Sequence, residues 1–214
     1  MIHCAAISDI HSDWDSVEGG LVKGGDILFI AGDLTYRGAK FEIEWALDQI
    51  STMHFTHKIV IAGNHDTYLQ TMNPTERAIL FARNGIRYLQ DELLTLNFPD
   101  RRISIYGTPW VPTCGEFAFQ GDEEELARHF SKIPEGLDVL LTHTPPYGIL
   151  DENRDKERCG SHALFEAVQR AKPKLHLFGH IHEAAGQLES EGILFRNVSS
   201  AESWNHEVPV LFSL

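Results

Sequence analysis

Short apolar runs alternate with longer stretches of mixed character along the 214 residues of this chain. Apolar runs of four to eight residues, bounded by glycine or polar residues, are typical of buried strands. The pattern predicts strands over 2–7, 26–31, 58–62, 93–97, 102–106, 138–142, 174–178, 193–198 and 208–213. Because helical segments separate many of these strands, the chain is predicted to be an α/β protein. The closely spaced strands after residue 93 indicate an additional antiparallel or mixed portion.

Helices are expected over 39–53, 74–84, 122–131 and 161–170. In the first of these, Phe41, Trp45, Ala46 and Ile50 recur at helical spacing. Residues at this spacing share one face of a helix, so we expect these four side chains to form its buried apolar face.

The composition is that of an ordinary globular protein, with 43% hydrophobic and 23% charged residues. It excludes a disordered or collagen-like chain, and the apolar runs fall far short of the roughly 20 residues that span a bilayer. Acidic residues outnumber basic ones by 31 to 18, which gives a formal net charge of −13. So acidic a chain repels long nucleic acids, so we do not expect one as partner. The short apolar runs likewise give no reason to expect a membrane partner.

The three cysteines, Cys4, Cys114 and Cys159, form no Cys-x-x-Cys pair. An odd number without paired spacing predicts neither a disulfide framework nor a zinc ribbon. The first residues do not resemble a signal peptide, so the reducing cytoplasm is the predicted location. With no repeat, linker or low-complexity segment, residues 1–214 are predicted to form a single domain. No pattern indicates an oligomeric state.

Polar clusters follow several predicted strands at the point where each strand ends. They are Asp9 with His11, Asp33, Asn64 with His65 and Asp66, His143, and His180 with His182. Ligands of open α/β sheets bind beyond the carboxyl ends of the strands, so we expect these side chains to meet in one cleft. Any one cluster could equally be a cap, a turn or a satisfied surface group. Five in order at strand ends favour a functional site.

The residue types in these clusters are those of a metal centre. Two carboxylates, one amide and four imidazoles are available from Asp9, His11, Asp33, Asn64, His143, His180 and His182. Imidazole combined with oxygen ligands suits manganese, iron, zinc or nickel. Seven ligands exceed the need of one four-coordinate ion and suit two ions, roughly 3.5–4 Å apart, that share a carboxylate. Gly32, Gly63 and Gly179 directly precede ligand residues and permit close turns of the backbone.

This ordered set of clusters, from residue 7 to about 183, resembles the calcineurin-like metallophosphoesterase superfamily. Segments 106–110, 143–151 and 173–183 are similar to its small phosphodiesterase branch, the metallophosphoesterase domain-containing proteins. The resemblance implies a four-layer α/β/β/α sandwich with two mixed sheets.

The resemblance also implies a role for each residue. Asp9, His11 and His182 would hold one ion, Asn64, His143 and His180 the other, and Asp33 would bridge both. His65 matches the catalytic histidine, which stabilises charge at phosphorus or protonates the leaving oxygen. Arg37 matches a phosphate-binding arginine. Relatives of the protein phosphatase type carry an aspartate, which orients the histidine, where this chain has Tyr36, so Asp66 becomes the candidate for that role.

The expected function is that of a dinuclear-metal-dependent phosphoester hydrolase that uses a metal-bridging hydroxide as nucleophile. We expect a phosphodiesterase acting on small substrates such as cyclic nucleotides. Manganese is the expected ion, with iron, zinc, nickel or cobalt as alternatives. A phosphomonoesterase acting on a nucleotide, sugar or protein phosphate is the alternative within the enzyme class. A non-catalytic interaction scaffold is a further alternative, which the complete ligand set disfavours.

Two loops bear on the substrate. Loop 109–120 carries Trp110, Phe117 and Phe119, which could stack a nucleobase or simply fill core. Loop 151–160 carries charges of both signs and is either a lid or a solvated loop.

Overall fold

The computed structural model describes residues 1–21, 23–201 and 209–214, and its first sheet has the strand order β13–β1–β2–β3–β4. The strands are β1 (His3–Ile7), β2 (Gly25–Ile30), β3 (Phe55–Val60), β4 (Arg87–Tyr88) and β13 (Val210–Ser213). Strands β1 to β4 are parallel, and β13 runs antiparallel to β1. Position 208 of the predicted last strand lies outside the described residues.

The second sheet has the order β11–β12–β10–β9–β6–β5. Its strands are β5 (Glu92–Asn97), β6 (Arg102–Thr108), β9 (Val139–Thr142), β10 (Leu175–Phe178), β11 (Gly186–Ser190) and β12 (Ile193–Asn197). The four inner strands are parallel, whereas β5 and β11 are antiparallel to their neighbours. A small ribbon pairs β7 (Val111–Pro112) with β8 (Gln120–Gly121).

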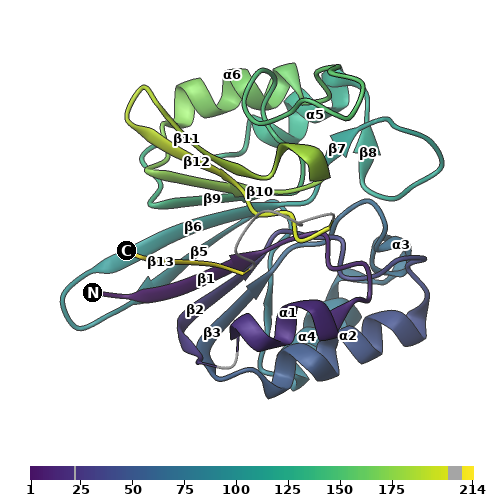
Figure 1. Ribbon diagram of the computed structural model, residues 1–214, viewed down its shortest axis with the longest axis vertical. Helices are drawn as coiled ribbons and strands as arrows, with labels where there is room; N and C mark the ends of the chain where they lie inside the picture. The colour runs from purple at the N-terminus through teal and green to yellow at the C-terminus, as the bar shows by residue number, and fades with distance from the viewer. Residues whose placement is uncertain (22, 202–208) are drawn as a thin grey trace.

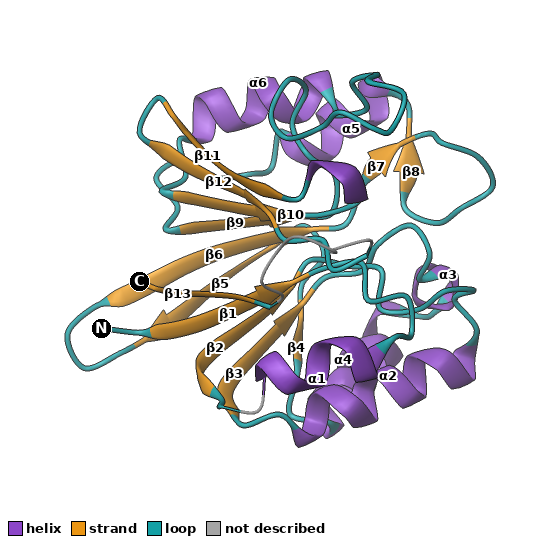
Figure 2. Cartoon of the chain, in the orientation of Figure 1, coloured by secondary structure: helices purple, strands orange, loops and turns teal. Residues whose placement is uncertain are grey.

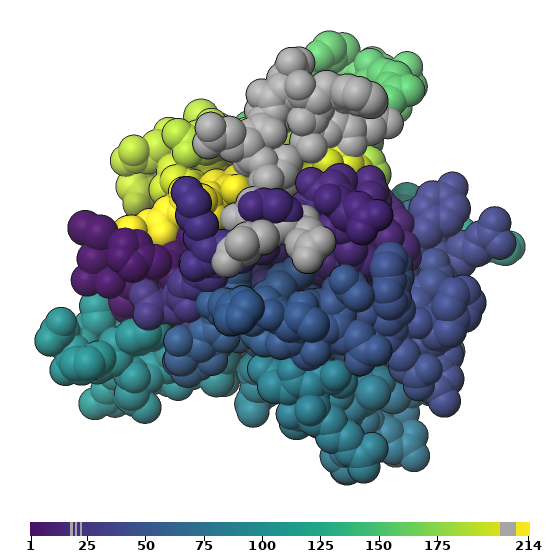
Figure 3. Space-filling model, turned by 60° about the horizontal axis from the view of Figure 1, so that its bottom comes forward, coloured from purple at the N-terminus to yellow at the C-terminus, as the bar shows by residue number. Residues whose placement is uncertain are grey.

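Helices cover the outer face of each sheet (Figure 1). The first sheet carries α1 (Trp14–Leu21), α2 (Lys40–Thr52), α3 (Thr67–Thr71) and α4 (Pro74–Arg83), and the second carries α5 (Glu123–Phe130) and α6 (His162–Ala171). Figure 2 shows the resulting order of helix, sheet, sheet and helix, and Figure 3 shows the surface from the side of the first helical layer. This confirms the predicted four-layer sandwich with two mixed sheets.

Apolar side chains fill each of the three spaces between layers. Strand β1 shows how alternation divides them, because Ala5 and Ile7 pack toward the first helical layer and Cys4 and Ala6 pack between the sheets. A third cluster, around Phe130, joins the second sheet to α5 and α6. Full burial of a large aliphatic or aromatic side chain contributes about 1.5–3 kcal/mol to stability. The three clusters together therefore stabilise the packing of the four layers.

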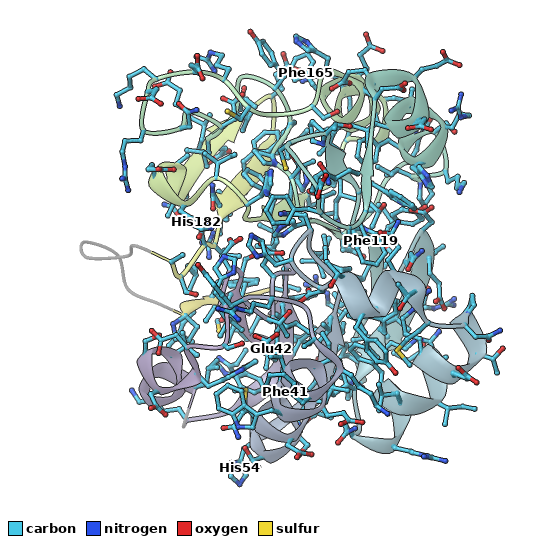
Figure 4. The ribbon with its side chains drawn as sticks, turned by 90° about the vertical axis from the view of Figure 1, so that its right-hand side faces the viewer. Phe41, Glu42, His54, Phe119, Phe165 and His182 are labelled. Atoms are coloured by element: carbon cyan, nitrogen blue, oxygen red, sulfur yellow. The ribbon has the colours of Figure 1, made fainter. Side chains whose placement is uncertain are left out.

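The prediction for the buried face of α2 is wrong in part. Phe41 and Trp45 are 71% and 43% exposed, and the helix instead buries an aliphatic stripe that includes Ile43 and Leu47. Both stripes have helical spacing, so spacing alone does not choose between them. Glu42 is buried on the same side, where its carboxylate accepts a hydrogen bond from the Ala39 N–H at 2.9 Å. This contact helps to determine which face of the helix turns inward. Figure 4 shows Phe41 and Glu42 on this part of the molecule.

The predicted strands and helices are present, with ends that differ by up to three residues. The short elements α1, α3, β4, β7 and β8 were not predicted, nor was β11. No helix within the described ranges is long and apolar enough to cross a membrane.

Candidate metal centre

The predicted ligand residues lie where parallel strands of both sheets end. Asp9, Asp33 and Asn64 follow β1, β2 and β3 of the first sheet, and His143 and His180 follow β9 and β10 of the second. Figure 4 looks onto this edge of the molecule, with His182 in the half built on the second sheet and Glu42 in the half built on the first. The structure therefore places these side chains at one edge, as the strand-end pattern predicts.

Backbone contacts join the two sheets beside this site. The Ser8 N–H, directly after β1, donates to the Val198 carbonyl at 2.9 Å, and the Ser200 N–H donates to the Ser8 carbonyl at 2.8 Å. The His180 N–H donates to both carboxylate oxygens of Asp9, at 3.1 and 3.0 Å. These hydrogen bonds fix the ligand loops of one sheet relative to those of the other.

One group of ligand atoms comes from Asp9, His11 and His182. The Nε2 atoms of His11 and His182 face each other at 3.3 Å, and His182 Nε2 lies 3.6 Å from Asp9 Oδ1. The three ligand atoms lie within 4.8 Å of one another. Two imidazole nitrogens that converge beside a carboxylate suit a divalent cation.

The neighbouring group contains Asp33, Asn64, His143 and His180. His143 Nε2 lies 3.0 Å from Asn64 Oδ1 and 3.3 Å from Asp33 Oδ1, and the ring centroids of His143 and His180 are 5.1 Å apart. The other oxygen of Asp33, Oδ2, lies 3.7 Å from His11 Nε2. The Asp33 carboxylate thus turns one oxygen toward each group.

The centre of the site is buried and charged. Asp9 and Asp33 are 1% exposed and His143 is fully buried. Burial by itself would raise the pKa of both carboxyl groups, but the neighbouring imidazoles outweigh it and hold the pKa of Asp9 and Asp33 below the usual range. Burial lowers the pKa of His143, but the charge and hydrogen bond of Asp33 raise it to about 9. Burial lowers the pKa of His180 to about 4.

Several ligand residues have positive φ angles, which residues other than glycine rarely adopt. The φ angles of Asp9, His11, Asp33 and His180 are 56°, 47°, 52° and 70°. Each such residue costs on the order of 1–3 kcal/mol, and such strain clusters at functional sites. The geometry of the site therefore comes at a cost to stability.

Glycines allow the loops to approach the ligands closely. A Cβ on Gly179 would overlap Asp9 Oδ2, and one on Gly63 would overlap Asp33 Oδ1. Gly32 has a φ of +99°, and its Cβ would lie 2.6 Å from His143 Nδ1. All three positions exclude any larger residue, which agrees with the reason the sequence suggested for them. The donor set, its convergence and this enclosure fit divalent metal ions.

His65 lies beside the ligand groups. Its ring centroid is 4.7 Å from that of His11, and its backbone N–H donates to Asp33 Oδ1 at 2.8 Å. Its Nδ1 lies 2.7 Å from the carbonyl oxygen of Tyr36. A carbonyl only accepts, so Nδ1 carries the proton in that bond and Nε2 remains available.

The prediction that Asp66 orients His65 is wrong. The Asp66 carboxylate is fully buried and accepts hydrogen bonds from Thr35 Oγ1 at 2.8 Å, Thr35 N–H at 3.1 Å and Gly63 N–H at 2.9 Å. Burial, together with the charge of Asp33, raises the pKa of Asp66 to about 6. Asp66 thus ties together the loops that follow β2 and β3, while the Tyr36 carbonyl orients the histidine. No sequence pattern indicates a backbone acceptor of this kind.

Arg37 lies on the same loop as Tyr36 and is exposed. Its backbone N–H donates to Glu42 Oε1 at 3.3 Å. Its guanidinium makes no ion pair with any residue that the structure describes. The predicted phosphate-binding role stays a prediction.

The aromatic loop 109–120 divides into core and surface. Phe119 is fully buried, and Trp110 stacks on His129 at 3.7 Å and donates from Nε1 to Asp91 at 3.2 Å. Phe119 therefore belongs to the core and Trp110 packs against it, so for these two rings the core alternative holds rather than base stacking. Phe117 is 42% exposed.

The loop 151–160 reaches the region next to His182. Arg154 Nε lies 3.7 Å from Glu183 Oε1, and Arg158 pairs with Asp151 at 3.0 Å. A cavity of about 580 Å³ lies between this loop and Glu183. The lid function stays a prediction.

Comparison with known protein families identifies the class of protein to which the chain belongs. Residues 2–184 match the model of the family described as calcineurin-like phosphoesterase. The chain belongs to this family of metallophosphoesterases.

Several curated proteins have sequences similar to that of this chain. Metallophosphoesterase domain-containing protein 1 of Homo sapiens is 34% identical over 217 residues, which cover 90% of this chain and 64% of the relative. UPF0046 protein T07D4.2 of Caenorhabditis elegans is 36% identical and covers 76% of this chain and 47% of the relative. UPF0046 protein K07C11.7 of the same organism is 32% identical and covers 93% and 70%. The chain thus spans about half to two thirds of the length of these curated relatives.

Solved structures share the fold at lower identity. TT1561 of Thermus thermophilus has a TM-score of 0.63 at 15% identity and covers 92% of this chain and 88% of that one. Phosphopantetheinyl hydrolase of Mycobacterium tuberculosis has a TM-score of 0.62 at 17% identity, with the same coverage. These likenesses establish the fold.

Proposed function

We propose that this chain hydrolyses phosphoesters with two divalent metal ions, and that small phosphodiesters such as cyclic nucleotides are its substrates. The observation that carries the proposal is the placement of Asp33, whose two oxygens lie 3.7 Å from His11 and 3.3 Å from His143. A carboxylate in this position suits a bridge between two ions. Manganese is the expected ion, with iron, zinc, nickel and cobalt as alternatives.

The ligand groups define which residues would hold each ion. Asp9, His11 and His182 form one set, Asn64, His143 and His180 form the other, and Asp33 belongs to both. Bound metal ions would supply positive charge that polarises the phosphoryl oxygens and activates water. The net charge of −13 is compatible with this, because affinity for phosphate would come from the site rather than from a basic surface.

The protein's own residues would complete the reaction. His65, whose Nδ1–H donates to the Tyr36 carbonyl, can in its doubly protonated imidazolium form transfer the Nε2 proton to the leaving oxygen, which leaves a neutral imidazole. Arg37, exposed on the neighbouring turn, can approach a phosphoryl oxygen from solvent. The cysteine thiols are not needed, and burial raises the pKa of Cys4 to about 12, which keeps it protonated.

A phosphomonoesterase is the second candidate, because the ligand set suits either ester. The test compares turnover of bis-p-nitrophenyl phosphate and p-nitrophenyl phosphate by the purified protein with added Mn²⁺. We expect faster turnover of the diester, and 2′,3′- and 3′,5′-cyclic nucleotides then refine the substrate class. A faster monoester would overturn the diester preference. Absence of both activities and of bound metal would favour the scaffold.

A further inference from the structure

The large aromatic side chains of loop 109–120 and Tyr36 differ in their surroundings. Phe119 is in the core and Trp110 packs against it, whereas Tyr36 and Phe117 remain 60% and 42% exposed. Both exposed rings lie against His65, with centroids 6.1 Å and 4.7 Å from that of the imidazole. Exposed aromatic rings that gather beside a polar site are typical of ligand-binding surfaces.

The backbone beside Phe117 is anchored through the next two residues of the chain. The Ala118 N–H donates to the carbonyl of Asn64 at 2.9 Å, which ties the loop to the residue next to His65. The Phe119 N–H donates to Gln70 Oε1 at 3.0 Å. Two anchors directly after Phe117 fix its backbone relative to the metal centre, so a ligand that meets this ring finds it already positioned.

Tyr36 is fixed in a different way. Its carbonyl accepts the hydrogen bond from His65 Nδ1, and the preceding Thr35 is bound through N–H and Oγ1 to Asp66. The tyrosine ring is tilted by 35° to the imidazole of His65, and Phe117 is tilted by 39°. Two rings whose backbone segments are anchored thus lie beside the histidine, on two different loops.

We propose that Tyr36 and Phe117 are specificity-determining residues that bind a planar aromatic ring on the leaving side of the phosphoester. The inference rests on the proposed function, because His65 must reach the leaving oxygen to protonate it. The atoms bonded to that oxygen then lie next to the residues around His65. Two aromatic faces near this position favour a leaving group that carries a flat π-system, directly or on a sugar, over one that carries only an alkyl group or a sugar. A phenyl ring and a nucleobase share this chemistry.

The experiment measures equilibrium binding and does not need turnover. Phenylphosphonate and methylphosphonate present the same anion and differ in the ring. With Mn²⁺ present, we expect wild-type protein to bind the phenyl compound about tenfold more tightly, the scale of one aromatic stacking contact. Phe117→Ala and Tyr36→Ala should each remove most of that preference and leave the affinity for methylphosphonate unchanged. Adenosine 5′-monophosphate against ribose 5-phosphate forms the second pair, which identifies a nucleobase as the ring.

Matched variants separate the ring from other effects. Phe117→Leu keeps apolar volume without a π-face and should lose the preference, whereas Tyr36→Phe should keep it. Phe165→Ala removes an exposed ring on α6, which Figure 4 shows far from the site, and should change nothing. Unchanged preference in both alanine variants, with methylphosphonate still bound, would overturn the inference alone. Failure of wild-type protein to bind any of these anions would overturn it together with the proposed function.

Discussion

The half of the site on the first sheet and the half on the second supply different chemistry. The first sheet contributes both carboxylates and the amide, Asp9, Asp33 and Asn64, and also His11. The second sheet contributes the three remaining imidazoles, His143, His180 and His182. Neither half alone combines enough anionic and neutral ligands to hold two ions. The complete site therefore requires the two sheets to pack against each other, and substitutions in either half should disturb it.

The largest effect is expected from Asp33→Asn on the first sheet. Loss of a carboxylate that faces both ligand groups should lower turnover by at least about 10⁴-fold, more than loss of an acid–base group does. Steady-state rates and elemental analysis of the purified protein measure the effect. Asp48→Asn, an exposed change on α2, is the control. Recovery of two tightly bound metal ions in Asp33→Asn would contradict the bridging role.

His65→Ala changes the first-sheet half without removing a proposed ligand. We expect turnover to fall by about 10²–10⁴-fold, the usual size of acid–base help, with metal content unchanged. His54→Ala, an exposed change at the far end of the molecule in Figure 4, should leave the rate as it is. Full turnover in His65→Ala would show that the histidine has no catalytic role.

Gly179→Ala tests the contact between the halves from the second sheet. The new methyl group would overlap Ser8 Oγ and Asp9 Oδ2, so the two sheets must shift. Overpacking of this kind costs about 1–3 kcal/mol, which urea unfolding measures. Gly19→Ala, in α1 with open space around it, should be neutral or slightly stabilising. Equal stability of the two variants would show that the sheets are not held at a fixed separation here.

His176 tests the second sheet behind the site. It is fully buried, and burial lowers its pKa to about 3. The unfolded chain takes up a proton near pH 6.5 while the folded one does not, so this contribution to stability is present above pH 6.5 and is lost as pH falls toward 3. Between about pH 6 and 4, wild type should lose about 1.4 kcal/mol per pH unit relative to His176→Gln. Urea unfolding of both proteins measures this. If their free energies of unfolding change equally between about pH 6 and 4, the prediction is contradicted.

The candidate site could be predicted in composition but not in all its internal contacts. Strand-end clusters depend on local sequence, and parallel strands bring their carboxyl ends to one edge, so the positions of Asp33 and His143 followed from the pattern. The partner of His65 did not, because a backbone carbonyl leaves no mark on residue identity. The orienting role predicted for Asp66 is wrong for a different reason, because adjacency in sequence does not show where a side chain points.

The fold was predictable where apolar runs are long and interrupted by clear breaks. The face of α2 was not, because Phe41 and Ile43 belong to two overlapping stripes and tertiary packing chose between them. The two-residue strands β4, β7 and β8 carry too few residues for a period to be visible.

The pairing of β1 with β13 has a consequence for how the protein is made. His3 to Ala6 lie opposite Ser213 to Val210, near the other end of the chain. On the ribosome, β1 to β3 are complete once Val60 has emerged, yet the strand that covers the free side of β1 follows roughly 10–30 s later. During that interval the nascent chain exposes an unpaired edge that can recruit a neighbouring polypeptide. Slow translation between β3 and β13 would therefore favour aggregation through β1.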